Sequence, residues 1–124
     1  MADTDDGSVD DSHDLLRRVH PRQVVFDQNL GVRRPSSAAF KDPEMSTDSE
    51  HLLNSIGETW AFCLKDYSGY SLARFKAGAA RALQLPVIAK PIDGNSAHVE
   101  VHGKKTQGTA TALVLAATWV HLEN

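Results

Sequence analysis

The segment PVIAKPIDGNSAHVEVHG, residues 86–103, constrains the fold more than any other part of the chain. Residues 86–92 and 97–103 carry the β-branched residues typical of strands, and DGNS (93–96) between them is typical of a tight turn. Two strands joined by so short a connection pair antiparallel. The segment therefore predicts a β-hairpin in an antiparallel sheet, with Pro91 placing the first strand at an edge or a bulge.

A capping box predicts the first helix. In TDSE (47–50), Thr47 is the expected N-cap, and Glu50 at N3 can reach back to the backbone N–H of that cap. The helix would span residues 48–56 and end at Gly57, which suits the left-handed position that follows many helices.

Two longer segments have the composition of helices. In SLARFKAGAARALQL (71–85), one face carries four apolar residues, Leu72, Phe75, Ala79 and Leu83, and this spacing predicts an amphipathic helix. Residues 109–122 are alanine-rich and apolar almost all round, which predicts a mostly buried closing helix. Threonine and valine oppose a helix in this last segment.

The remaining segments are short and give mixed signals. LLRRVHP (15–21) fits one helical turn or a short strand, and QVVFD (23–27) favours a strand. Residues 28–35 have the composition of a turn, and SSAAF (36–40) suggests another short strand. Apolar residues point to both sides in ETWAFCLKD (58–66), which predicts a central strand covered on both faces.

These elements predict a single α+β domain over residues 14–124, with two or three helices packed on one face of a small, mostly antiparallel sheet. The chain has 124 residues, enough for one domain with a real core. Six of its sixteen acidic residues lie in the first fourteen positions, so residues 1–13 are expected to form a disordered acidic tail. Such a tail either solubilises the protein or screens a basic surface until a partner displaces it.

A single cysteine, Cys63, excludes an internal disulfide. It lies in the apolar run WAFCL, where a buried thiol is expected rather than a nucleophile. Low cysteine content without a signal peptide fits a cytoplasmic location. The longest apolar run, residues 112–120, falls well short of the roughly 20 residues of a membrane span.

HVEVH (98–102) is the best candidate for a chemical site. As a strand, it would point His98, Glu100 and His102 to one face and its valines to the other. Two imidazoles and a carboxylate are a known ligand set for zinc or non-haem iron, and Glu100 is also the candidate catalytic residue. A fourth ligand, such as His51 or Asp93, would help. The alternative is an ordinary strand with valines in the core and its polar face in water.

Five arginines lie close together in the sequence, and they form the candidate partner-binding segment: Arg17, Arg18, Arg22, Arg33 and Arg34. Guanidinium groups beside Phe26 or Phe40 could contact nucleic acid. The chain beyond the tail is only mildly basic, however, so a solvated patch or a docking surface for an acidic protein partner explains the arginines at least as well.

Two resemblances accompany these patterns. The pattern RVHP followed by RPSSAAF, within residues 15–47, resembles one in small uncharacterised bacterial proteins and implies no established activity. The chain also resembles ADP-ribosyltransferase folds, whose motif positions would be matched by Arg18 or His20, Ser36 or Ser37, and Glu100. It departs from them because it lacks paired glutamates and is short.

The function expected from the sequence is a small, non-catalytic, cytoplasmic protein-binding module of a bacterial system. Its support is the lack of a phosphate-binding glycine loop, a Cys-x-x-Cys pair or a nucleophile elbow, together with the asymmetric charge. The competing hypothesis is a small enzyme built on His98, Glu100 and His102, either metal-assisted or ADP-ribosyltransferase-like. No cofactor is expected beyond that divalent metal, and no membrane association is expected.

Overall fold

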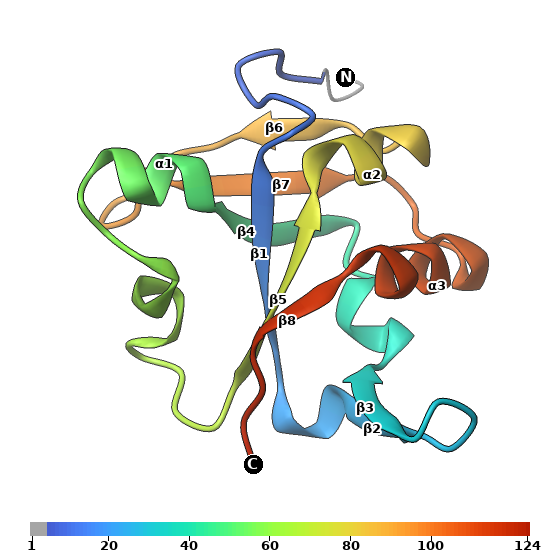
Figure 1. Ribbon diagram of the computed structural model, residues 1–124. Helices are drawn as coiled ribbons and strands as arrows, with labels where there is room; N and C mark the ends of the chain where they lie inside the picture. The colour runs from blue at the N-terminus through green and yellow to red at the C-terminus, as the bar shows by residue number, and fades with distance from the viewer. Residues whose placement is uncertain (1–4) are drawn as a thin grey trace.

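A six-stranded antiparallel sheet forms the centre of the protein, of which we describe residues 5–124 in a computed structural model. The strand order is β6-β7-β4-β1-β5-β8, and a separate hairpin pairs β2 with β3. In Figure 1, β1 and β5 run steeply across β4, β7 and β6, so the sheet is strongly twisted. The strands are β1 (Asp14–Val19), β2 (Val24–Asp27), β3 (Val32–Pro35), β4 (Glu44–Ser49), β5 (Ser71–Lys76), β6 (Val87–Ala89), β7 (His98–His102) and β8 (Thr118–His121).

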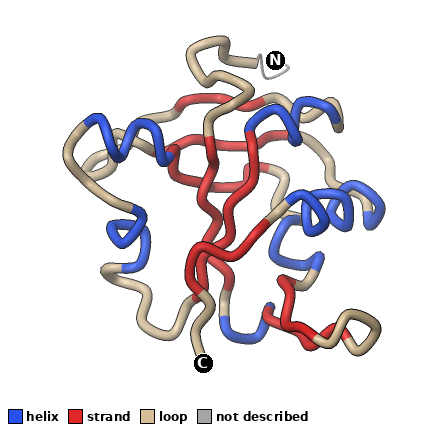
Figure 2. Tube along the Cα trace, in the orientation of Figure 1, coloured by secondary structure: helices blue, strands red, loops and turns tan. Residues whose placement is uncertain are grey.

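Helices cover both sides of the sheet (Figure 2). On the side of Leu15, the larger core includes residues of α2, α3 and η2; on the side of Leu16, a smaller core includes residues of α1 and η3. The elements are α1 (Glu50–Ser55), α2 (Ala77–Ala82) and α3 (Gln107–Ala116), with 3₁₀ helices η1 (Pro21–Gln23), η2 (Ser37–Phe40) and η3 (Trp60–Leu64). The predicted α+β class is confirmed, and two of the three α-helices share one side. No helix within residues 5–124 is long and apolar enough to cross a membrane.

The predicted hairpin over residues 86–103 is confirmed. Strands β6 and β7 pair antiparallel, with Val87 opposite Val101 and Ala89 opposite Val99. The valines of β7 are buried in the larger core, as the alternating sequence predicts. The first strand is also the edge of the sheet, which agrees with the position of Pro91 just beyond it.

Two segments that the sequence predicted as single helices each form a helix and a strand instead. Residues 71–85 form β5 and then α2, and residues 109–122 include most of α3 and then β8. In β5 both faces are covered, since Leu72 packs in the smaller core and Phe75 in the larger. Apolar side chains on both faces of a strand hide its alternation, and the remaining pattern is similar to that of a helix.

Three further predictions are wrong in type or boundary. Residues 58–66 contain η3 instead of a central strand, and residues 36–40 contain η2 instead of a strand. Helix α1 begins later than the capping box predicts, with Ser49 as N-cap. Thr47 lies in β4, where its hydroxyl donates to the carbonyl oxygen of Val99.

The acidic N-terminal segment covers the edge strand β6. The sequence predicted a disordered tail over residues 1–13; residues 1–4 lie outside the described part, and residues 5–13 nevertheless contact the domain. The N–H of Val87 donates to Asp5, the N–H of Ala89 donates to Asp6, and the N–H of Asp6 donates to the Val87 carbonyl. Val9 is buried in the larger core. The aspartates thus bond to backbone groups that an unpaired edge would leave exposed.

Arg81 of α2 anchors the same segment. Its guanidinium donates to the carboxylates of Asp5 and Asp11 and to the carbonyl of Asp6. These carboxylates raise the pKa of Arg81. Burial acts to raise the pKa of Asp5, but the hydrogen bonds from Arg81 and Val87 outweigh it and lower that pKa. The aspartates therefore screen Arg81 rather than the arginines of residues 17–34.

Candidate functional site

Strands β4 and β7 together present a row of polar side chains on one face of the sheet. In their register, Asp48 lies opposite His98, Ser46 opposite Glu100, and Glu44 opposite His102. The alternate residues of both strands point to the larger core. The sequence therefore predicted the division of β7 into a valine face and a polar face correctly.

The polar face of β7 is not exposed to solvent, which the interpretation of HVEVH as an ordinary strand had expected. His98 is 7% exposed and His102 is 2% exposed, while Glu100 is half-buried. Local alternation shows which residues share a face, but the cover comes from elsewhere: residues of η3 and of the turn 92–95 line a pocket with His98. The alternation within β7 therefore contains no signal of this burial.

The two histidines of β7 have different surroundings. Nε2 of His102 lies 2.7 Å from Oε1 of Glu100, within hydrogen-bonding distance. His98 instead places Nδ1 2.9 Å from the carbonyl oxygen of Lys90, and this same nitrogen is 3.9 Å from Glu100. The predicted three-residue site is thus divided, with His102 and Glu100 together and His98 facing another group.

Glu44 takes the place of His98 in the cluster that could hold a metal. One ligand atom each from Glu44, Glu100 and His102 lies within 4.8 Å of the others. Two carboxylates and an imidazole suit zinc, manganese or iron. Lys90 competes for the same carboxylate, since its ammonium is 3.6 Å from Glu100. Sequence analysis missed Glu44 because only the register of β4 against β7 brings it beside His102.

The two proposed fourth ligands lie elsewhere. His51 stacks on His13, with ring centroids 4.1 Å apart, and neither belongs to the cluster. Asp93 is exposed at a pocket lined also by His98. The fold therefore brings neither residue into the group formed by Glu44, Glu100 and His102.

A pocket of about 450 Å³ opens over the other end of the β4–β7 pair. Its floor includes Asp48, which is buried and accepts a 2.6 Å hydrogen bond from the Asn95 side chain. The guanidinium of Arg18 lies 3.5 Å from Asp48 and 4.0 Å from the centre of the Tyr67 ring. Cys63 also lines the pocket, but burial raises the pKa of its thiol well above the ordinary range, which opposes a nucleophilic role.

Arg17 and Arg18 point away from each other, to opposite faces of β1. Arg17 donates to the carbonyl oxygens of Ala39 and Ser46, and burial lowers its pKa. Arg18 donates to the Cys63 carbonyl and pairs with Asp48. Arg17 is thus bonded to interior carbonyls and Arg18 lines the pocket, so neither guanidinium belongs to the hairpin surface of the other three arginines.

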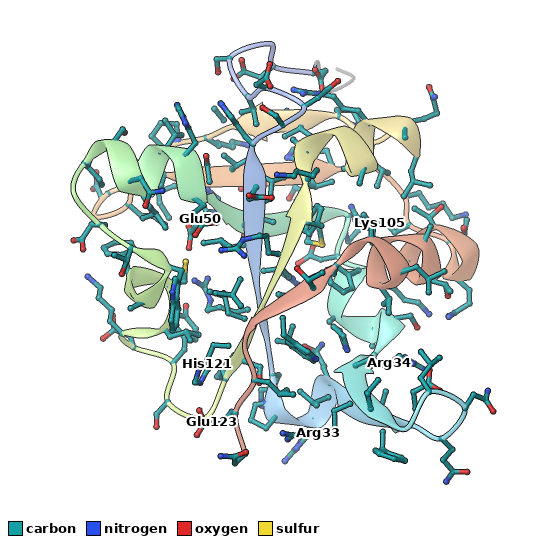
Figure 3. The ribbon with its side chains drawn as sticks, viewed as in Figure 1. Arg33, Arg34, Glu50, Lys105, His121 and Glu123 are labelled. Carbon is teal, nitrogen blue, oxygen red and sulfur yellow. The ribbon has the colours of Figure 1, made fainter. Side chains whose placement is uncertain are left out.

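The other three arginines lie in or next to the β2–β3 hairpin. Arg22 is exposed in η1, directly before β2, while Arg33 and Arg34 lie in β3 (Figure 3). Arg34 pairs with Asp27 across the hairpin, and Arg33 donates to the carbonyl of Glu123.

The same hairpin exposes large apolar side chains. Phe26 is 61% exposed, Leu30 is 68% exposed and Val32 is 52% exposed. The indole N–H of Trp119 in β8 donates to the Arg33 carbonyl and fixes the hairpin to the sheet. Three of the seven exposed large apolar residues within residues 5–124 thus lie in the same segment as the arginines, which residue spacing alone did not reveal.

Lys105 is a buried cation that sequence analysis missed. It follows β7, at the start of the segment leading to α3 (Figure 3), and its ammonium donates to the carbonyls of Asp42, Val101 and Gly103. Burial lowers the pKa of Lys105 to about 8. Since all three acceptors are backbone carbonyls, this lysine joins the segment before β4 to the end of β7 and the residue that follows it.

The residues that carry the ADP-ribosyltransferase resemblance are dispersed. Ser36 caps η2 and Ser37 accepts from Gln107, so both lie by a helix rather than on a strand. The core residues of η2 are on the valine side of β7, opposite the face that carries Glu100. Neither a protein-family model, nor a curated protein, nor a solved structure matches the chain, so both resemblances stay predictions.

Proposed function

We propose that the protein is a non-catalytic binding module that docks on a partner protein through the β2–β3 hairpin. One observation carries the proposal: Phe26, Leu30 and Val32 are exposed on a hairpin whose flanking arginines also face solvent. Phe26 lies opposite Arg33 and Val32 lies opposite Asp27, so Phe26 and Val32 point to opposite faces of the hairpin. A partner groove with apolar walls and an acidic rim that takes up the hairpin complements this arrangement.

The energetics favour docking. Full burial of an exposed large apolar side chain contributes about 1.5–3 kcal/mol, and each of these three residues would contribute part of that because it is already partly covered. A two-stranded hairpin is only marginally stable alone. Here the Trp119 and Arg33 contacts fix it to the sheet, which limits the conformational entropy lost on binding.

Charge reversal tests the basic part of this surface. We would immobilise the full chain and quantify proteins captured from lysate of its source cells, comparing wild type with R22E/R33E. Arg34 is left intact because it bonds to Asp27 within the hairpin. The matched control, K65E/K104E, reverses two exposed lysines elsewhere. The proposal requires a partner that R22E/R33E loses and that K65E/K104E retains.

A second pair of variants tests the apolar part. F26S/V32S should lose the same partner, whereas I56S/L115S, which changes exposed apolar residues outside the hairpin, should keep it. Reconstitution with the purified partner and an affinity measurement at two salt concentrations then separates the charge contribution from the apolar one. Equal loss from both pairs would contradict docking through the hairpin.

A divalent-metal centre in a small enzyme is the second candidate function. The observation that favours it is the convergence of Glu44, Glu100 and His102 within 4.8 Å. These residues would hold a cation as a Lewis acid, and the exposed Glu44 leaves one side open to substrate.

Elemental analysis tests this candidate directly. Untagged protein, incubated with zinc or manganese and then desalted, should retain one ion per chain. H102A should lose the ion, and H98A should keep it because His98 faces the Lys90 carbonyl instead. Loss of the ion in both variants would favour the ligand set His98, Glu100 and His102 expected from the sequence. A wild-type protein that retains no metal would exclude a metal centre at Glu44, Glu100 and His102.

A further inference from the structure

The pocket over Asp48 and His98 has unused hydrogen-bonding groups on a rigid floor. Its volume, about 450 Å³, lies within the roughly 300–1,000 Å³ typical of small-molecule sites. Strands β1, β4 and β7 supply the floor, and η3 with the turn 92–95 supplies the walls. Two ionisable floor residues, Asp48 and His98, are both more than nine-tenths buried.

His98 offers an acceptor to this pocket. Its Nδ1 lies 2.9 Å from the Lys90 carbonyl, which can only accept, so the ring proton is on Nδ1. In the neutral ring Nε2 then carries a lone pair. Nε2 has no hydrogen-bond partner among residues 5–124. Every fully buried side-chain nitrogen and oxygen of those residues has a partner, so Nε2 is not fully buried and opens to the pocket that His98 lines.

Arg18 offers donors beside that acceptor. Only its Nη1 is used, by the Cys63 carbonyl and by Asp48, and its Nε and Nη2 donate to no residue of 5–124. The guanidinium carbon lies over the Tyr67 ring, 4.0 Å from its centre, and this cation–π contact helps to hold the side chain in place.

The floor is close to neutral. The charges of Arg18 and Asp48 offset each other at 3.5 Å, and the other charged lining residues, Lys65, Asp66 and Asp93, are exposed to solvent. A ligand group that relies on charge alone gains little there. The floor instead suits an uncharged group that both donates and accepts hydrogen bonds, and the rings of Phe62 and Tyr67 add apolar surface to the walls.

We propose that this pocket binds the base of a nucleoside or nucleotide. A nucleobase is planar and presents acceptors next to N–H donors along one edge. Its acceptors fit the free edge of Arg18, and its N–H fits Nε2 of His98. This ligand site is independent of the docking hairpin and of the cluster at Glu44.

NMR titration of the full chain tests the proposal. The probes are AMP, GMP, CMP and UMP, each up to about 10 mM, with ribose 5-phosphate as a probe that keeps the sugar and phosphate but lacks the base. The readouts are the ring nitrogens of His98 and the Nε of Arg18. At least one nucleotide should shift both signals in a saturable way, and ribose 5-phosphate should shift neither.

Matched variants locate the binding. H98Q should weaken the best nucleotide at least tenfold, while H121Q, which changes a histidine stacked on Trp60 outside the pocket, should not. If H98Q does not fold, Y67A removes ring surface from a partly exposed position and should weaken binding similarly. Equal binding of ribose 5-phosphate would overturn base recognition, and so would the lack of any saturable shift.

Discussion

The polar face of strands β4 and β7 and the β2–β3 hairpin depart from ordinary burial in opposite ways. The first buries Asp48, His98 and His102; the second exposes Phe26 and Leu30. Buried polar groups and clustered exposed apolar groups are the informative departures from the usual distribution of residues. Both point to function, but they point to different kinds of ligand.

The two regions differ in whether the rest of the fold compensates their unusual side chains. On the polar face, Asp48 is bonded to Asn95 and paired with Arg18, so its charge is compensated within the fold. On the hairpin, no other part of the described chain covers Phe26, Leu30 or Val32 enough to bury them. The polar face compensates its buried charge within the fold, so the proposed ligand would only add to it, whereas the hairpin leaves apolar side chains exposed that the proposed partner would cover.

Removal of the buried carboxylate should have the largest effect on stability. D48A leaves Arg18 half-buried without its counter-charge and Asn95 without its acceptor. We expect the free energy of unfolding to fall by about 2–3 kcal/mol, less than for a fully buried pair because Arg18 is partly exposed. Urea denaturation measures it.

The matched control for D48A is D93A, which removes an exposed carboxylate from the same pocket. It should change the free energy of unfolding by less than about 0.5 kcal/mol. If D48A is as mild as D93A, then the polar face is not a structural network and the contrast with the hairpin fails.

A pH titration examines a second buried polar group. Burial lowers the pKa of Lys105 to about 8, against about 10.5 in an unfolded chain. Between these values the unfolded chain binds more protons, so the stability of the wild type should rise with pH across this window. Relative to K105M, the gain should be of the order of 1–3 kcal/mol.

Denaturation of wild type and K105M at several pH values from 7 to about 10.5 measures the difference between their free energies of unfolding. The contributions of the other titrating groups cancel in this difference. A constant difference would mean that the three carbonyl acceptors hold Lys105 charged throughout. The polar interior would then contain a permanent cation rather than a titrating one.

Sequence analysis predicted local features of this fold and missed those that depend on distant partners. The hairpin of β6 and β7 follows from local alternation and a turn, and it is confirmed. Glu44 beside His102 depends on strand register between segments more than fifty residues apart, which local patterns do not encode. The charge of the first residues likewise gave no sign that Asp5 and Asp6 would bond to β6.

The mistaken helix over residues 71–85 has a physical cause. Leu72 and Phe75 are three residues apart, which fits one face of a helix, yet they point to opposite sides of β5 into different cores. The polar face was misjudged for a related reason. His98 and His102 alternate with valines, as solvent-facing residues do. The walls that η3 and the turn 92–95 place around His98 turn its side of the strand into a pocket, and they come from distant parts of the chain.

Loss of Arg81 should have a smaller, local effect. R81M removes the ion pairs with Asp5 and Asp11 but leaves Val9 in the core. Because these carboxylates are largely exposed, we expect a loss of about 0.5–1 kcal/mol. Amide hydrogen exchange at Val87 and Ala89 should accelerate, while exchange at Val99 should not. Unchanged exchange at Val87 would show that the segment covers β6 without Arg81.

The hairpin should show the smallest effect on stability. In F26S/V32S, two exposed apolar side chains are lost without a cavity, so the free energy of unfolding should change by less than about 0.5 kcal/mol. The same substitutions should abolish partner capture. Denaturation and capture measured on the same preparation separate the two roles. A loss of stability near that of D48A would mean that Phe26 and Val32 support the fold, and the hairpin would then be part of the core rather than a docking surface.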